Sequence, residues 1–242
     1  MSGYLAVNKA FQIQSDNSLC LLLFFAVLLV YWFDHILDIK KYGASISSRH
    51  QVFAQKSKLI YVSGVLILTF SIYFSITVMS FQLLKYGLLI GLLCVVYLFF
   101  NHYKWLNKEL IAASIYAAGI YFQVLLKPSL LGLVSCLLFW GITYFAMMGI
   151  AKIEHRTDSY FGIPNNFKLN WLQNHFFELL FLGAVLLLFS FYNTSIFSLI
   201  LSYVLMLICL NLQFNTKNKF HFLKENYRIA IEWLFLLPWI FV

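Results

Sequence analysis

The sequence is dominated by long apolar runs that are separated by short polar segments. Hydrophobic residues make up 62% of the 242 positions, whereas charged residues make up only 11%. A soluble core of this size does not need so much apolar surface, so the chain is predicted to be an integral membrane protein. The runs are continuous rather than alternating, which favours helices over a β-barrel because each helix satisfies its own backbone hydrogen bonds. The predicted fold class is all-α, a polytopic bundle of transmembrane helices.

Eight of these runs are candidate membrane spans. A helix rises about 1.5 Å per residue, so about 20 residues cross the hydrocarbon of a bilayer, and most of the runs approach this length. The predicted spans cover residues 17–37, 59–79, 83–100, 110–126, 129–151, 175–191, 194–213 and 228–242. We predict a single membrane domain over residues 1–242, in which residues 1–16 are either an interfacial segment or the remnant of a lost span.

The connections between the runs alternate in charge. Those near Ser80, Pro128 and Asn193 are short and nearly uncharged, and all but three of the 17 Lys and Arg residues lie on the other side. The basic connections are 39–58, 101–109, 152–174 and 215–227. Such a bias is typical of the positive-inside rule, so these connections are predicted to be cytoplasmic, in a bacterial inner membrane. The net charge of +8 then reflects topology, and no nucleic-acid partner is predicted.

Two acidic pairs at helical spacing lie at the same end of two predicted spans. Asp34 and Asp38 close the first span, and Glu154 and Asp158 follow the fifth. Residues four apart on a helix share a face, and like charges at that spacing repel unless a cation lies between them. Mg2+ prefers carboxylate oxygens and keeps coordination sites for substrate phosphate. The four carboxylates are therefore candidate metal ligands and candidate catalytic residues.

Each pair by itself also has a plainer interpretation. The first pair is consistent with interfacial acids that pair with neighbouring lysines, and the second with a solvated loop that contains its own basic partners. Two such pairs, on two spans and on one side, favour a shared metal and phosphate site. Glu178, close to His175 at the start of the sixth span, is either a functional acid or a charge at a helix start.

Two basic residues are placed to assist in binding a diphosphate. Arg49 lies in the first basic connection, and Lys108 lies at the start of the fourth span. A diphosphate carries several negative charges, and an arginine offers its oxygens a bidentate fork of N–H donors. Each of the two residues could also be an ordinary basic residue of a cytoplasmic connection, without a role in binding.

Together these residues resemble the pattern of the UbiA superfamily of membrane prenyltransferases. The matching positions are Asp34-x3-Asp38, then Arg49, then Lys108 before a span, and Glu154-x3-Asp158 with Gly162 beyond. The resemblance implies an all-helical fold around a central cavity. It also implies Mg2+ as the cofactor and a polyprenyl group that moves from an allylic diphosphate to a lipophilic, generally aromatic, acceptor.

By this resemblance, Asp34 and Asp38 are the last two acids of the first motif, and Glu154 and Asp158 form the second motif. Arg49 and Lys108 are then the residues that bind the substrate diphosphate. The chain departs from the family pattern in several places. Val30 and Tyr31 stand where the first motif usually has Asn and Asp, His50 replaces a Pro, and Glu154 replaces an Asp. One N-terminal span of the family has no predicted counterpart.

Three other interpretations stay open at the level of the sequence. The chain could be a non-catalytic relative of the family, a membrane protein whose acidic pairs serve structure or assembly, or a small transporter in which the acids couple ions or protons. Transporter acids generally lie near the middle of the membrane, whereas the two acidic pairs lie at span ends. The acceptor, the prenyl chain length and the oligomeric state are not set by the sequence.

Overall fold

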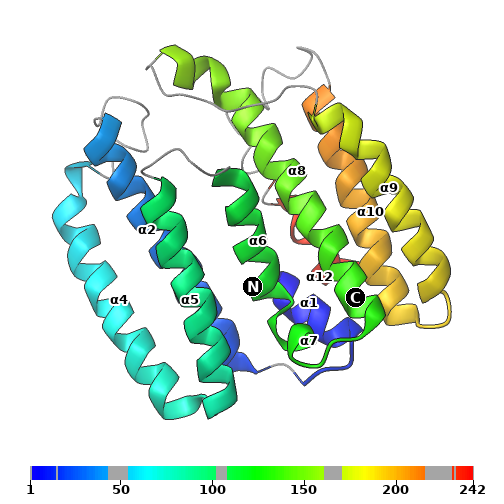
Figure 1. Cartoon of the computed structure of the whole chain (residues 1–242), viewed down its shortest axis with the longest axis horizontal. Coiled ribbons are helices and arrows are strands. Elements are labelled where there is room, and N and C mark those ends of the chain that lie inside the picture. The colour runs from blue at the N-terminus through cyan, green and yellow to red at the C-terminus, as the bar shows by residue number, and fades with distance from the viewer. Residues whose placement is uncertain are drawn as a thin grey trace. The chain divides into compact units, whose positions relative to one another are not determined.

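The computed structural model describes residues 2–14, 16–42, 54–101, 108–160, 171–215, 231 and 233–241. All regular elements in these ranges are helices, without any strand, which confirms the all-α fold class (Figure 1). The helices are α1 (Ser2–Ala10), α2 (Asn17–Tyr42), α4 (Ser57–Val78), α5 (Phe81–Asn101), α6 (Lys108–Ile120), α7 (Phe122–Leu126), α8 (Leu130–Tyr160), α9 (Trp171–Ser190), α10 (Thr194–Asn215) and α12 (Leu237–Phe241).

Within the described ranges, four helical segments are long and apolar enough to cross a membrane. They are Asn17–Asp34 of α2, Ser57–Val78 of α4, Leu130–Ile150 of α8 and Thr194–Leu212 of α10. Three further apolar segments are shorter, namely Leu83–Leu98, Glu109–Ile120 and His175–Ser190. These seven segments overlap the first seven predicted spans. Of the predicted eighth span, the structure describes residues 231 and 233–241, and the short helix α12 lies in this part. The predicted fourth span is interrupted at Tyr121, between α6 and α7.

The contacts between residues divide the chain into two compact units. Unit 1 comprises Met1–Ser15, Ala112–Ile153 and Phe167–Val242. Unit 2 comprises Asp16–Ile111 and Glu154–Asn166. Helix α8 contributes to both, since its last turns belong to unit 2. The single membrane domain expected from the sequence stays a prediction.

Unit 1 has a core of aromatic rings centred on Phe139 of α8. The centroid of this ring lies within 6.2 Å of the ring centroids of Tyr116, Tyr121, Tyr203 and Phe235. The hydroxyl groups of Tyr121 and Tyr203 are 3.0 Å apart and form a hydrogen bond between two fully buried side chains. A hydroxyl buried among apolar rings is costly unless it is paired, so this bond lets both tyrosines occupy the core.

Helix α1 lies in the interior of unit 1, where it contacts α7, α10 and α12. Its side chains Tyr4, Val7 and Ala10 are fully buried. The helix ends in a Schellman motif, in which the N–H of Ile13 donates to the carbonyl of Asn8 over 2.8 Å. Gln12 takes the left-handed conformation that this motif requires, with φ of 55°. The residues expected to be an interfacial or remnant segment therefore form a short interior helix.

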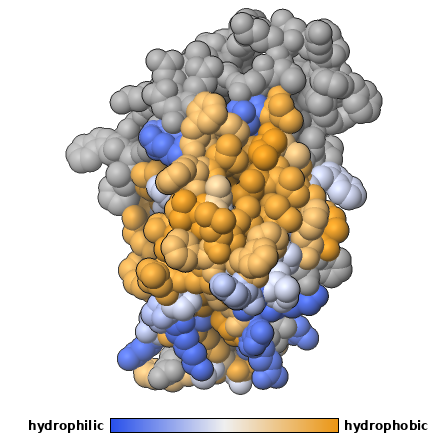
Figure 2. All heavy atoms as spheres, turned by 90° about the vertical axis from the view of Figure 1, so that its right-hand side faces the viewer, coloured by the Kyte–Doolittle hydropathy of each residue, from blue (hydrophilic) through white to orange (hydrophobic). Residues whose placement is uncertain are grey.

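Glycines allow close helix contacts in unit 1. A Cβ at Gly183 of α9 would lie 2.6 Å from a methyl group of Val204 on α10, and one at Gly141 of α8 would collide with Leu179 of α9. The opposite face of α9 is exposed and apolar, with Phe177, Phe181, Leu188 and Phe189 among its exposed residues. Viewed from the side of α9, a broad hydrophobic band is bordered below by hydrophilic residues (Figure 2). Such a band suits contact with lipid.

Unit 2 is built on the helices α2, α4 and α5, and α2 contacts both of the others. Helix α4 is apolar all round, and most of its large side chains are exposed. Beyond its first residue, every Ser and Thr hydroxyl of α4 donates to a backbone carbonyl four residues earlier, over 2.7–3.0 Å. Such internal bonding satisfies a hydroxyl where water is lacking, so it fits a helix surrounded by lipid.

Side chains cap the helices that begin on the predicted non-cytoplasmic side. Asp16 accepts the N–H of Ser18 at the start of α2 over 2.8 Å, and Ser129 accepts the N–H of Gly132 at the start of α8 over 3.0 Å. Ser80 and Asn193 cap α5 and α10 in the same way. Each cap satisfies a backbone donor that the first helical turn leaves unpaired. The short connections therefore turn the chain sharply between helices, as seen between α4 and α5 (Figure 1).

Candidate metal and diphosphate site

Helix α2 presents the first acidic pair. It runs without interruption from Asn17 to Tyr42, so Asp34 and Asp38 lie one turn apart on the same face, as predicted. The apolar stretch that can cross a membrane ends at Asp34. The pair therefore lies at the end of the hydrocarbon-spanning part of α2 and not at its middle. The side chain of Asp38 is outside the described residues.

The carboxylate of Asp34 is half-buried and has a partner on a different helix. The phenolic hydroxyl of Tyr97, near the end of α5, donates to Oδ1 of Asp34 over 3.5 Å. Tyr97 is 6% exposed, which is rare in unit 2, where most large side chains face outwards. The hydroxyl of Tyr97 therefore lies beside the carboxylate, so α5 contributes to the surroundings of Asp34.

Helix α8 presents the second acidic pair. It continues for ten residues past Ile150, where its apolar stretch ends, as far as Tyr160. Glu154 and Asp158 therefore lie one turn apart on a helix, although the sequence placed them in a connection. From Glu154 onwards α8 belongs to unit 2, the unit that also contains α2. The side chains of both acids fall outside the described part of α8.

The two predicted diphosphate ligands are only partly covered by the structure. Lys108 is the first residue of α6, at the end of the predicted basic connection, but its side chain is not among those described. Arg49 lies outside the described residues altogether. Their roles in binding a substrate stay predictions.

The chemistry of the donor set fits a hard divalent cation. Ionised carboxylates only accept hydrogen bonds and bind cations, and Asp34 accepts the Tyr97 hydroxyl on Oδ1. Among the described side chains there is no group of three or more His, Cys, Asp and Glu that could hold a metal. The described side chains include that of Asp34 but not those of Asp38, Glu154 and Asp158. This absence therefore does not test a metal site formed by all four acids.

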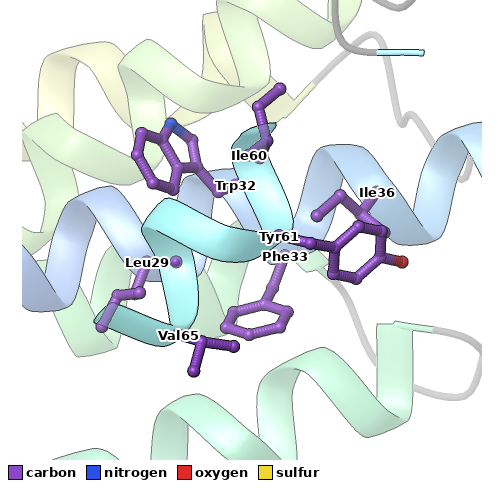
Figure 3. A pocket seen from close by; sticks show the side chains of 8 residues that line it. Leu29, Trp32, Phe33, Ile36, Ile60, Tyr61 and Val65 are labelled. Carbon is purple, nitrogen blue, oxygen red and sulfur yellow. The ribbon is translucent and has the colours of Figure 1, made fainter. Parts of the chain in front are cut away.

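A small hollow between α2 and α4 is separate from the acidic pairs. It has a volume of about 50 Å³, and its walls include Leu29, Phe33 and Ile36 of α2 and Gly64 of α4 (Figure 3). At 3.6 residues per turn, these α2 residues lie on the side of the helix opposite Asp34. Pockets for small organic ligands have volumes of about 300 Å³ or more, so the hollow is too small for a prenyl chain.

Glu178 of α9 has a close partner. Its Oε2 lies 2.6 Å from Nδ1 of His175, one turn earlier, and its side chain is largely exposed. Glu178 is the eighth residue of α9, so it does not lie in the first turn of that helix. Tyr97, by contrast, is a site residue that the sequence did not indicate, because it is one of 15 tyrosines and carries no spacing relation to the acids.

Comparison of the chain with protein-family models, with curated proteins and with solved structures finds no match.

Proposed function

We propose that this chain is a Mg2+-dependent membrane prenyltransferase of the UbiA type. It would move a polyprenyl group from an allylic diphosphate to a lipophilic, generally aromatic, acceptor. One observation carries the proposal: both acidic pairs lie on uninterrupted helices, each just at or beyond the end of an apolar stretch, and both belong to unit 2. Four carboxylates with this arrangement suit a shared cation and a bound diphosphate.

The proposed topology has eight spans, with the basic connections and the site in the cytoplasm of a bacterial cell. The seven described apolar helices support the first seven spans. In this topology both acidic pairs end helices that run towards the basic side. A water-soluble diphosphate group can then reach the carboxylates while the prenyl chain stays in the hydrocarbon.

In the proposed reaction, Mg2+, the carboxylates and two basic residues help the diphosphate to leave. Mg2+ bound by the carboxylates would neutralise the diphosphate and make it a better leaving group. Arg49 and Lys108 would hold the diphosphate oxygens and share that charge. The allylic C–O bond breaks, and its electron pair leaves with the diphosphate. A ring carbon of the acceptor bonds to the allylic carbon, and the ring then loses a proton to the released diphosphate or to water.

The depth of the acids favours this function over transport. Acids that couple ions in transporters lie near the middle of the membrane, on broken helices. Asp34 lies at the very end of its apolar stretch, and Glu154 lies beyond the end of its own, on helices without a break at these positions. Charges there are close to the headgroups, where a diphosphate is also found.

The proposal is tested by incubating the purified full chain in lipid nanodiscs with labelled polyprenyl diphosphates of several lengths and a membrane lipid extract. Mass spectrometry identifies any prenylated product, with Mg2+ or with a chelator. We expect a product that depends on Mg2+. We expect Asp34→Asn and Asp158→Asn to lower its rate of formation by about 100-fold or more, since each removes a charge that stabilises the reacting complex.

The matched control is Asp16→Asn, at the opposite end of α2. It removes the same charge from the same helix, and asparagine caps a helix as well as aspartate does. We expect full activity from this variant. A wild-type chain that forms no product, or an Asp34→Asn chain that forms as much as wild type, would identify a non-catalytic relative instead.

A further inference from the structure

The small hollow between α2 and α4 is open to the outside of unit 2. Tyr61 and Val65 of α4 form part of its wall and are 49% and 59% exposed. Gly64 leaves the hollow partly unfilled, since a Cβ added there would still lie 3.8 Å from the nearest heavy atom, in the ring of Trp32. An apolar hollow on a surface that suits lipid gains van der Waals contacts when a hydrocarbon chain lies in it. A chain that lies along the opening need not be enclosed, so the small volume does not exclude it.

The two helices run in opposite directions along the hollow. Ile36 of α2 and Tyr61 of α4 lie towards one of its ends (Figure 3). Leu29 and Val65, which come earlier in α2 and later in α4, lie towards the other end. The residues that follow Ile36 and those that precede Tyr61 are therefore at the same end of the hollow.

Two lysines lie at that end and continue the walls of the hollow. Lys40 follows Ile36 by four residues in α2, and Lys58 precedes Tyr61 by three residues in α4. Residues at these spacings share one side of a helix, so each lysine lies about one turn beyond a residue that lines the hollow. Both lysines are exposed. Asp34 is on the opposite side of α2, so it does not stand between the lysines and the hollow.

We propose that the hollow binds one anionic phospholipid of the membrane. Part of an acyl chain fills the apolar hollow, and the phosphate of the headgroup lies against Lys40 and Lys58. The charge pattern carries the proposal, because an apolar recess that ends in two cations complements a lipid with an anionic head. Basic pockets between membrane helices bind anionic headgroups in this way. The proposed site uses none of the acidic residues, so it goes beyond the proposed catalysis and does not depend on it.

The experiment is native mass spectrometry of the full chain in a mild detergent, titrated with phosphatidylglycerol or with phosphatidylcholine that has the same acyl chains. Glycerol phosphate, a headgroup without chains, is used in a third titration. The spectra give the Kd of the first bound molecule and the number of protein copies. The test variant is Lys40→Gln/Lys58→Gln. The matched control is Lys85→Gln/Lys127→Gln, which removes two charges from exposed lysines elsewhere in the chain.

We expect wild type to bind phosphatidylglycerol about 10-fold or more tightly than phosphatidylcholine. The reason is that each lysine close to an anionic headgroup contributes about 5-fold in affinity. The variant without Lys40 and Lys58 should lower this preference to less than about 3-fold, whereas the control without Lys85 and Lys127 should keep it.

A second set of variants tests the hollow itself. Gly64→Val fills part of the hollow and should raise the Kd of both phospholipids by about 4-fold, the effect of displacing one methylene group. Gly64→Ala is the second variant if valine prevents folding, because an added Cβ fits at 3.8 Å from Trp32. Gly91→Val is the control, because a Cβ at Gly91 of α5 has no heavy atom within 4 Å, and both Kd values should stay unchanged.

Equal affinity of wild type for the two phospholipids, or a preference that survives the loss of both lysines, would overturn the proposal. Unchanged lipid binding in folded Gly64→Val and Gly64→Ala would also overturn it. Glycerol phosphate that binds as tightly as phosphatidylglycerol would indicate a phosphate site in which the hollow takes no part. Wild-type dimers that Gly64→Val dissociates would assign the hollow to a second copy of the chain instead of a lipid.

Discussion

Among the described residues, the helical segments of unit 1 that are long enough to cross a membrane are about half buried, whereas those of unit 2 are largely exposed. Within the structure, 56% of Leu130–Ile150 and 44% of Thr194–Leu212 is buried, against 11% of Asn17–Asp34 and 6% of Ser57–Val78. All four segments have similar hydropathy, from 1.9 to 2.2. Helices of equal apolar character therefore pack against protein in unit 1, and in unit 2 they expose surfaces that suit contact with lipid.

The two units also differ in what their few polar groups do. In unit 1 the Tyr121–Tyr203 hydrogen bond joins two helices within a packed core. In unit 2 the hydroxyls of α4 bond within their own helix, and Tyr97 and Asp34 form a polar side-chain contact between α5 and α2. Unit 1 thus has a packed aromatic core, and unit 2 carries the acidic pairs.

The largest expected contrast comes from trimming one leucine in each unit. Leu207 of α10 is fully buried, whereas Leu66 of α4 is 65% exposed. We expect Leu207→Ala to lower the free energy of unfolding by about 2–5 kcal/mol, because it leaves a cavity in a close-packed interior. Leu66→Ala should cost less than about 1 kcal/mol, because lipid fills the space.

Thermal unfolding of both leucine variants in the same detergent measures this difference. Similar losses in the two would break the distinction between a unit held by packing and a unit that faces lipid.

A smaller contrast is expected from adding one methyl group to a glycine. A Cβ added at Gly183 would lie 2.6 Å from a methyl group of Val204. The branched valine side chain has little freedom to rotate away. We expect Gly183→Ala to lower the free energy of unfolding by about 1–3 kcal/mol. Gly91 of α5 has no heavy atom within 4 Å of that position, so Gly91→Ala should be neutral or stabilising by up to about 1 kcal/mol. Unfolding midpoints in a common detergent decide the signs.

The hydroxyl pair in unit 1 gives a third, weaker test. Tyr203→Phe leaves the buried hydroxyl of Tyr121 without its partner, so we expect a loss of about 1–2 kcal/mol. The double variant Tyr121→Phe/Tyr203→Phe should be closer to wild type than the single one, since no polar group is then left unpaired. A double variant that loses the sum of both single effects would show that the hydroxyls contribute separately.

The smallest effect concerns the start of α2. Asp16→Ala removes the acceptor for the N–H of Ser18 and should cost about 1 kcal/mol, whereas Asp16→Asn should be near neutral. Hydrogen exchange of the first turn of α2 is the suitable measurement, because loss of a cap frays the helix end before it unfolds the protein. Equal exchange in all three proteins would mean that lipid contacts alone fix the start of this helix.

The local features of the candidate site followed from the sequence, and its surroundings did not. The spacing of Asp34 and Asp38 required one helix face, and α2 has that face. The spacing of Glu154 and Asp158 suggested the same, although the length of α8 beyond Ile150 could not be seen in a segment that is no longer apolar. The contact of Tyr97 with Asp34 could not be predicted from the sequence, because it depends on how α5 packs against α2.

The sequence by itself determined that the chain is helical and that several of its helices can cross a membrane, because in lipid a backbone must satisfy its own hydrogen bonds. It also determined the helical phase of each acidic pair. Only the tertiary structure decided which apolar faces meet protein, where glycines bring helices together, and which tyrosine reaches Asp34. The physical reason is that lipid tails are as apolar as leucine, so composition does not distinguish a buried face from a lipid-facing one.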